Sequence, residues 1–192
     1  MELTEEILTS ILIEKLDELS DYKKALEVVT LNAEGRIWLI GGIVSRVLIE
    51  RLYETPQGNY DFDFLVENLK EELVVPTGWT VVRTKHGNPT FIKGDLEVDL
   101  FPIATHHFIK SRHLEPTIDN FFRGVPFTIQ AIAFDVRTQK VIGKTGMIAL
   151  EKREYRVNNL EEAQAMSSAK GITINERILK KAESMGLKPV LL

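Results

Sequence analysis

The sequence predicts an α+β fold: a mixed or antiparallel sheet with helices packed on it, followed by a short helical tail. Three observations predict this class. An amphipathic helical pattern opens the chain, short apolar runs typical of strands recur between residues 36 and 101, and two helix-capping patterns follow residue 157. The 192 residues, 44% hydrophobic and 27% charged, have the composition of one globular domain. We expect N-terminal helices in 1–35, a core in 36–145 and a tail of the same domain in 146–192.

The overall charge and the N-terminal sequence limit the function classes. The formal net charge is −4, so no large basic excess is available to grip nucleic acid. The chain has no cysteine, which rules out a disulfide framework and a thiolate metal site. Its first residues are acidic where a signal peptide is basic, and its apolar runs are far shorter than the ~20 residues that span a bilayer. We expect a cytoplasmic protein with no membrane partner.

The first third of the chain alternates helices with short strands. Residues 4–18 have apolar positions at helical spacing and a cap at Thr4, and a second helix is expected over about 21–29. The apolar run "RIWLI" (36–40) predicts a short buried strand. Two glycines follow it, and "VSRVLIERLY" (44–53) then predicts a helix.

The next segment predicts a strand and a hairpin. A turn at 55–59 leads into the strand of "NYDFDFLVE", after which a weak helix is expected near 67–73. Strands at 79–84 and 89–93 are joined through the turn "KHGNP". We expect His86 of this turn to be an ordinary loop residue.

The second half of the chain adds an acidic strand and then further helices. "LEVDLF" (96–101) alternates apolar and acidic residues as a strand does. Residues 105–122 are polar and expected to be helical in part, whereas the apolar run "FTIQAIAFD" (127–135) fits strand or helix equally well. In the tail, one helix over 160–168 and another before residue 186 are predicted by their capping residues, Asn158 or Asn159 for the first and Thr173 with Glu176 for the second.

The two strands with acidic residues predict a metal site. Side chains two apart on a strand share a face, so Asp61 and Asp63 stand side by side, and so do Glu97 and Asp99. Like charges on one face repel, and half-buried carboxylates lose hydration. If the two strands are neighbours, three or four carboxylates converge and need a cation. Magnesium, for which manganese can substitute, is the expected ion, because it takes oxygen ligands and is usually held by a few carboxylates together with substrate phosphates.

A glycine pair upstream predicts a phosphate-binding loop. Gly41 and Gly42 stand where a strand ends and a helix begins. Glycine lets the backbone approach a phosphate closely, and the N-terminus of a helix offers free N–H groups. Together, a phosphate loop and a metal-binding acid pair indicate phosphoryl or nucleotidyl transfer.

These motifs resemble a known family. "IWLIGGIVSRVLIERLYETPQGNYDFDFLV" resembles the head domain of the polymerase-β-like nucleotidyltransferases, in the branch of bacterial poly(A) polymerases and CCA-adding tRNA nucleotidyltransferases. That branch has a strand, GG-x-V-R-D, a helix and then D-x-D-F. "KHGNPTFIKGDLEVDLF" and "FTIQAIAFDVRTQKVIG" are similar to its later segments, so that the resemblance covers about 36–143. It implies metal binding by Asp61 and Asp63, a third acid at Glu97 or Asp99, and a nucleoside triphosphate held at Gly41 and Gly42.

The chain departs from this branch at basic positions. Ser45-Arg46 replaces Arg-Asp, which moves the arginine by one, and Gly124-Val125-Pro126 replaces Arg-Arg-Asp, which leaves only Arg123 nearby. Pro102 stands where an arginine follows phenylalanine. Arg46 and Arg123 are therefore the candidate charge partners of the triphosphate. The family's RNA-holding domains have no counterpart in these residues, so we expect a small-molecule or protein acceptor rather than RNA.

The third acid has two candidate residues, and the activity has three candidate hypotheses. The motif alignment favours Glu97, whereas the shorter side chain and apolar surroundings of Asp99 favour Asp99, which we prefer. The first functional hypothesis is a metal-dependent nucleotidyltransferase. The alternative is a non-catalytic nucleotide- or partner-binding relic of the same fold, and a hydrolase that uses the same metal cluster is a weaker third. A cation aimed at the glycine loop, from Arg46, Arg123 or Lys93, would favour the enzyme.

Overall fold

A mixed sheet forms the centre of the computed structural model, which describes residues 3–58, 60–84 and 87–192. Within these residues the sheet has seven strands in the order β3-β4-β5-β2-β1-β6-β7. β2 and β5 run parallel, and the other neighbours pair antiparallel. The strands are β1 (Ala33–Ile40), β2 (Phe62–Leu69), β3 (Thr80–Arg83), β4 (Pro89–Lys93), β5 (Leu96–Pro102), β6 (Ala133–Asp135) and β7 (Lys140–Ile142).

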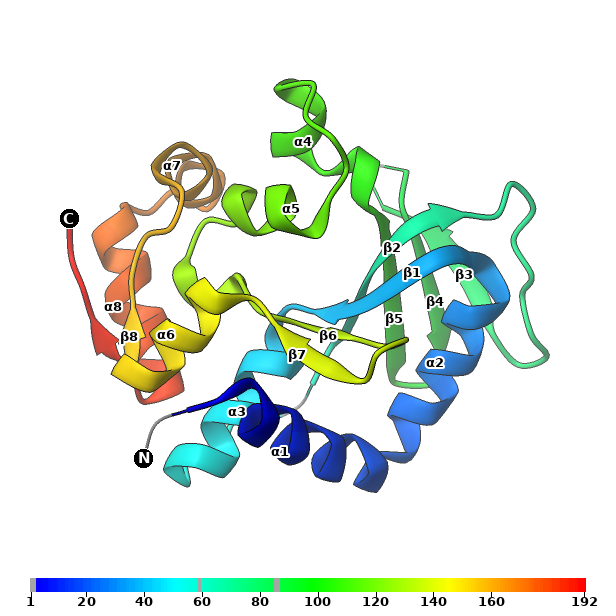
Figure 1. The fold of residues 1–192 in the computed structure, drawn as a ribbon. Helices are drawn as coiled ribbons and strands as arrows, with labels where there is room; N and C mark the ends of the chain where they lie inside the picture. The colour runs from blue at the N-terminus through cyan, green and yellow to red at the C-terminus, as the bar shows by residue number, and fades with distance from the viewer. Residues whose placement is uncertain (1–2, 59, 85–86) are drawn as a thin grey trace.

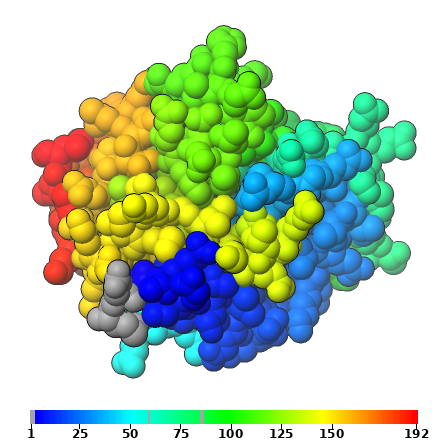
Figure 2. All heavy atoms as spheres, viewed as in Figure 1, coloured from blue at the N-terminus to red at the C-terminus, as the bar shows by residue number. Residues whose placement is uncertain are grey.

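Helices cover both faces of this sheet. Figure 1 shows α1, α2 and α3 below it, α4 and α5 above it, and the later helices at one end. In Figure 2 the green surface around α4 and α5 stands out as a lobe. The helices are α1 (Glu5–Glu18), α2 (Ser20–Asn32), α3 (Gly42–Tyr53), α4 (His107–Ser111), α5 (Ile118–Gly124), α6 (Lys144–Lys152), α7 (Leu160–Ser168) and α8 (Ile174–Met185), with short 3-10 turns η1 (Ile103–Thr105) and η2 (Thr128–Gln130). A small parallel pair, β8 (Glu154–Tyr155) and β9 (Lys188–Pro189), lies beside α8.

The core divides at the sheet because side chains of a strand alternate between faces. Phe62, Phe64 and Val66 of β2 point into the larger cluster, which contains residues from Leu8 to Leu187. Leu65 points the other way, into a smaller cluster beneath α4 and α5. Every second residue of β2 therefore belongs to the α4–α5 face, and Asp63 is one of them.

Most predicted elements are confirmed, including the capped ones. Thr4 accepts a hydrogen bond from the Ile7 N–H at the start of α1, Asn159 caps α7, and Thr173 with Glu176 forms the capping box of α8. The predicted turns at 55–59 and 85–89 include Asn59, Lys85 and His86, which lie outside the described residues. No helix in the described part of the chain combines the length and apolarity that crossing a membrane requires.

One prediction of secondary structure is wrong, and two further segments were left open or not predicted. The helix expected near 67–73 is wrong, because β2 continues to Leu69, which pairs with Ala33 of β1. Residues 70–79 then return without a helix. The run 127–135, left open between helix and strand, contains both η2 and β6. α6 was not predicted, since it begins after Gly143 with no side-chain cap.

Candidate active site

The parallel pairing of β2 with β5 brings two carboxylates together. Asp63 is the register partner of Asp99. Partner residues on adjacent strands face the same way about 5 Å apart, so these two acids stand side by side on the α4–α5 face. Phe62 and Val98 form the preceding register pair. Asp61 and Glu97 come directly before these two residues in the chain, and both are exposed. The structure thus pairs Asp63 with Asp99, and leaves Asp61 and Glu97 at the outer end.

Asp99 is fixed from its other side. β4 runs antiparallel to β5 with Thr90 opposite Asp99, and the Thr90 hydroxyl donates a hydrogen bond to the Asp99 carboxylate. Thr90 is buried, so this bond holds one carboxylate oxygen in place. The sequence carries no motif that would have identified Thr90, because its role depends on which residue of β5 it faces.

Asp63 touches the glycine loop. Gly41 has φ +74°, a conformation that residues with a Cβ rarely adopt, and a Cβ there would overlap the Asp63 carboxylate. The antiparallel pairing of Ile40 with Asp63 explains this contact, since Gly41 directly follows Ile40. Glycine is needed at position 41 for both reasons, and the acid strand and the loop form one surface.

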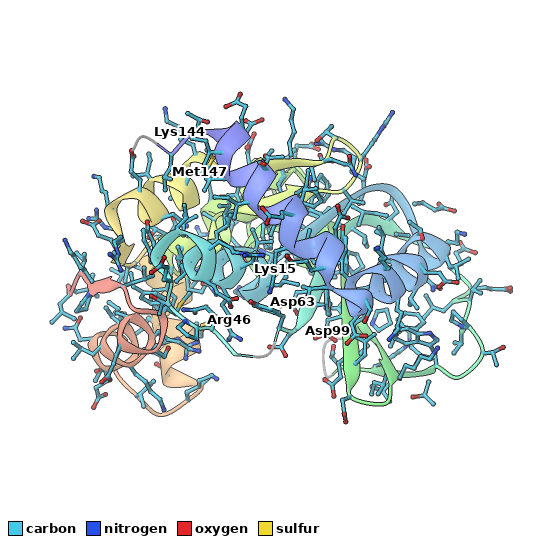
Figure 3. The ribbon with its side chains drawn as sticks, turned by 90° about the horizontal axis from the view of Figure 1, so that it is seen from below. Lys15, Arg46, Asp63, Asp99, Lys144 and Met147 are labelled. Atoms are coloured by element: carbon cyan, nitrogen blue, oxygen red, sulfur yellow. The ribbon has the colours of Figure 1, made fainter. Side chains whose placement is uncertain are left out.

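The pKa of Asp63 is strongly perturbed by its surroundings. Burial raises the pKa of Asp63 to about 7, and the negative charges of Asp99 and Asp61 contribute further, while Arg46 opposes the shift. A cation beside Asp63 would reverse the two repulsive contributions. In the view of Figure 3, Asp63 lies between Arg46 and Asp99.

The start of α3 presents backbone N–H groups beside these acids. Gly41 is its N-cap and gives no side-chain hydrogen bond, so the first N–H groups of the helix have no cap from that residue. The Ser45 hydroxyl, which lies 3.4 Å from the carbonyl oxygens of both Gly41 and Gly42, is buried against the loop. Ser45 therefore holds the loop through its carbonyl oxygens, and Gly41 provides no side-chain acceptor for the N–H groups that follow.

Arg46 is the basic side chain at the loop. A Cβ built on Gly42 would lie 3.3 Å from the Arg46 Nε and 3.5 Å from its guanidinium carbon. Gly42 and Arg46 are four residues apart on α3 and so share a helix face. The shift of the arginine by one position, seen in the sequence, thus still leaves a guanidinium against the second glycine.

The other two candidate cations lie elsewhere. Arg123 donates to the Asn120 side chain and lines a separate cavity with Arg36 and Lys144. Lys93 lies 5.8 Å from the centroid of the Trp79 ring, at the turn between β4 and β5. Neither residue is placed at the glycine loop.

Two cavities lie at the aspartates of this segment, one lined by Asp63 and the other by Asp61. One of about 430 Å³ lies between the sheet and the α4–α5 segment, with Gly41 and Asp63 in its wall and mainly apolar surroundings that include Phe101 and Phe121. The second, about 990 Å³, is lined by Asp61 and by residues of the β4–β5 turn. A small molecule in the first cavity would lie beside Asp63.

The donor set suits a magnesium ion that is completed by its substrate. Within 3–58, 60–84 and 87–192, no three histidine or acidic side chains converge as a ready-made metal site. The structure instead offers a pair, Asp63 and Asp99, with Asp61 close enough to repel Asp63. Magnesium is commonly held by one or two carboxylates plus phosphate oxygens and water, so this pair fits it.

Solved structures share this fold. The chain aligns over 91% of its length with the Thermotoga maritima CCA-adding enzyme complexed with tRNA, at 18% identity and a TM-score of 0.54. A CCA-adding enzyme with ATP aligns over 97% at 19% identity and a TM-score of 0.52, and the Bacillus stearothermophilus CCA-adding enzyme with CTP over 87% at 18% and 0.52. The chain spans 44%, 39% and 38% of these three proteins. The sequence matches no protein-family model and no curated protein.

At such identities the likeness establishes the fold. The chain shares its fold with part of these CCA-adding enzymes, as the resemblance of its motifs implied. This agrees with the mixed sheet and with the position of the glycine loop before α3.

Proposed function

We propose that this chain is a metal-dependent nucleotidyltransferase that moves a nucleoside monophosphate from a nucleoside triphosphate to an acceptor. One observation carries the proposal: Asp63 lies opposite Asp99 and in contact with Gly41, so an acid pair and a helix N-terminus share one surface. A helix N-terminus binds phosphate, and an acid pair binds a magnesium ion that also contacts phosphate. A magnesium nucleotide therefore needs both features side by side. Solved proteins of this fold that bind ATP and CTP support the choice of substrate.

The proposed reaction is a displacement at the α-phosphorus. An acceptor oxygen forms a bond to that phosphorus, the bond to the bridging α–β oxygen breaks, and pyrophosphate leaves with the electron pair of the bridge. The acceptor's proton passes to solvent. Asp63 and Asp99 would hold magnesium, which when bound stabilises negative charge on the phosphates and lowers the pKa of the acceptor.

The chain's own groups position the substrate. The N–H groups at the start of α3 would bind phosphate oxygens, and the Arg46 guanidinium beside Gly42 would add a positive charge. Thr90 would keep the Asp99 carboxylate oriented through its hydrogen bond. Residues 36–145 would form the nucleotidyltransferase core. Residues 1–35 and 146–192 would belong to the same domain, which the shared hydrophobic cluster favours.

A non-catalytic relic that binds nucleotide is the second candidate. The exposed position of Asp61 and the lack of three converging ligands among the described residues favour it. Arg46 at the glycine loop favours the enzyme, because a working triphosphate pocket needs a cation besides magnesium. We propose the enzyme on this ground.

The deciding experiment is a transfer assay. The protein is incubated with α-labelled nucleoside triphosphates, magnesium or manganese, and separate pools of metabolites, proteins and RNA, and pyrophosphate release is followed in parallel. Magnesium-dependent label on an acceptor with matching pyrophosphate, lost in Asp63→Ala, is the expected result. Tight nucleotide binding with no pyrophosphate release from any pool would favour the relic.

A further inference from the structure

Basic side chains gather on one face of the C-terminal helix α8, and one of them, Lys181, interacts electrostatically with Arg46 of α3. Arg177 and Lys181 are four residues apart on α8, so they share a helix face, and both are half-buried. Lys170 and Lys180 are exposed neighbours. In the part of the chain that the structure describes, none of these four cations forms an ion pair with a carboxylate. The surface is thus positive without being neutralised by its own acids.

Arg177 is placed as a donor without an acceptor. Its guanidinium carbon lies 5.8 Å from the centroid of the Phe127 ring, and its Nε is buried with no hydrogen-bond partner among the described residues. Buried N–H groups are nearly always hydrogen-bonded, so an unpaired one calls for an explanation such as a missing ligand. Phe127 directly precedes η2, whose Gln130 lines the same cavity as Gly41 and Asp63.

The positive charges of this group and of Arg46 act on Lys181. Its pKa is lowered, first by burial and then by Arg46, Arg177 and the two exposed lysines. Arg46 of α3 and Lys181 of α8 therefore lie near enough to repel each other, and a multiply charged anion between them would offset that repulsion. Because the Arg46 side chain lies against Gly42, the same charges continue to the start of α3.

We propose that Arg46, Arg177 and Lys181 form an anion site that binds the β- and γ-phosphates of the nucleoside triphosphate. This rests on the proposed function and assigns the end of the triphosphate that points away from Asp63 and Asp99. The site holds pyrophosphate after the α–β bond breaks, since the leaving group keeps its charge and the electron pair of the bridge. Polyphosphate is preferred to a carboxylate ligand because it carries several charges and can accept from all three cations at once.

The test measures binding of inorganic tripolyphosphate by calorimetry. Arg177→Gln and Lys181→Gln should each weaken binding about 10-fold or more, the typical loss for one charge-assisted hydrogen bond. The double variant should lose about 100-fold or more. Lys188→Gln, which removes an exposed lysine of β9 outside the group, is the matched control and should stay within about twofold. Thermal melts verify folding. If Arg177→Gln melts early through its loss of contact with Phe127, Lys181→Gln carries the test.

The outcomes separate this site from the transfer reaction. Unchanged tripolyphosphate binding in the double variant, or none in the wild type, overturns the anion site. Tripolyphosphate binding lost in the double variant, together with no transfer by the wild type, keeps the site and refutes the transferase. Normal transfer with an unchanged KM for the nucleotide in the double variant supports the transferase and refutes the anion site. A single-stranded oligonucleotide is titrated in parallel, and a loss confined to it would assign the group to a polymer instead and overturn the proposal.

Discussion

The Asp63 carboxylate lies in the space that a Cβ atom on Gly41 would need. Any side chain at position 41 must therefore move an acid of β2, and any movement of Asp63 changes the surface that the glycine loop presents. A change in the loop before α3 is therefore coupled to a change in the acid pair, although 21 residues lie between Gly41 and Asp63 in the chain.

The acid pair gives the first prediction. Asp63→Ala and Asp99→Ala should each lower magnesium-dependent turnover by more than about 100-fold, because loss of a metal ligand exceeds the 10–100-fold typical of an outer partner. Glu97→Ala, an exposed acid on the same strand as Asp99, should retain most activity. Steady-state kinetics across magnesium concentrations measures both. The larger loss in Glu97→Ala would reverse the choice of third acid.

The raised pKa of Asp63 predicts that replacing its carboxylate stabilises the metal-free protein at high pH. Its folded pKa of about 7 exceeds the ordinary value of 3.8, so the folded state binds a proton more tightly than the unfolded chain does. Ionisation of Asp63 therefore lowers the free energy of unfolding. This loss is absent below about pH 4, grows as the pH rises to about 7, and is complete above it. Without metal, Asp63→Asn should therefore melt higher than wild type at pH 8 and nearly equal to it at pH 4.

A pH series of melts with chelator present measures this effect, and Glu97→Gln serves as an exposed control. An equal gain at both pH values would mean that the asparagine acts through packing rather than through charge.

Gly41→Ala should cost more than its backbone conformation alone. Gly41 has φ +74° and ψ −148°, a region in which a Cβ costs about 1–3 kcal/mol, and here the Cβ also displaces the Asp63 carboxylate. Gly94→Ala is the matched control, because Gly94 has φ +60° and no atom within 4 Å of its Cβ position. Chemical denaturation compares the two, and nucleotide binding should fall only in Gly41→Ala. Equal costs would show that Asp63 moves aside freely.

Thr90 should act as a positioning residue. Thr90→Val keeps the shape but removes the hydroxyl that donates to Asp99. The magnesium concentration for half-maximal activity should rise about 10-fold, the lower end for a lost outer partner, while turnover at saturating metal changes less. Thr80→Val on β3 is an exposed control. If Thr90→Val lowers turnover equally at every metal concentration, its role is structural.

The acceptor prediction concerns RNA. The net charge is −4, and phosphate polymers are bound mainly through lysine and arginine. Label from a nucleoside triphosphate should therefore appear in a small molecule or a protein, with RNA unlabelled at physiological salt. The Thermotoga maritima neighbour is complexed with tRNA, which makes tRNA the sharpest RNA substrate to include. RNA labelling that disappears in Asp63→Ala would refute this expectation.

Local signals accounted for much of the fold. Thr4, Asn159 and Thr173 identified their helices because a cap acts within one turn of its residue. The helix expected near 67–73 failed because pairing with Ala33, far back in the chain, extends β2 to Leu69. Helix α6 was missed for a similar reason. Its Gly146 packs against the backbone of Ala131, and no nearby side chain marks its start.

The site divides in the same way between local and distant information. The spacing of Asp61 and Asp63 and the position of the glycine pair were readable, since both depend on neighbours in sequence. The partnership of Asp63 with Asp99 depends on strand register, and the approach of Arg177 and Lys181 depends on how α8 packs. Neither has a local signature. Sequence alone therefore favoured Asp99 over Glu97 on side-chain length and surroundings, without the register that pairs Asp99 with Asp63.

The larger core cluster has a consequence for synthesis on the ribosome. Ile178 and Ala182 of α8 belong to the same cluster as Leu8 and Leu12 of α1 and Phe64 of β2. Translation adds about 5–20 residues per second and domains generally fold as units, so the acidic strands emerge seconds before the helix that completes this cluster. During that interval the part of the cluster that α8 covers stays exposed and is a target for chaperones that bind nascent chains.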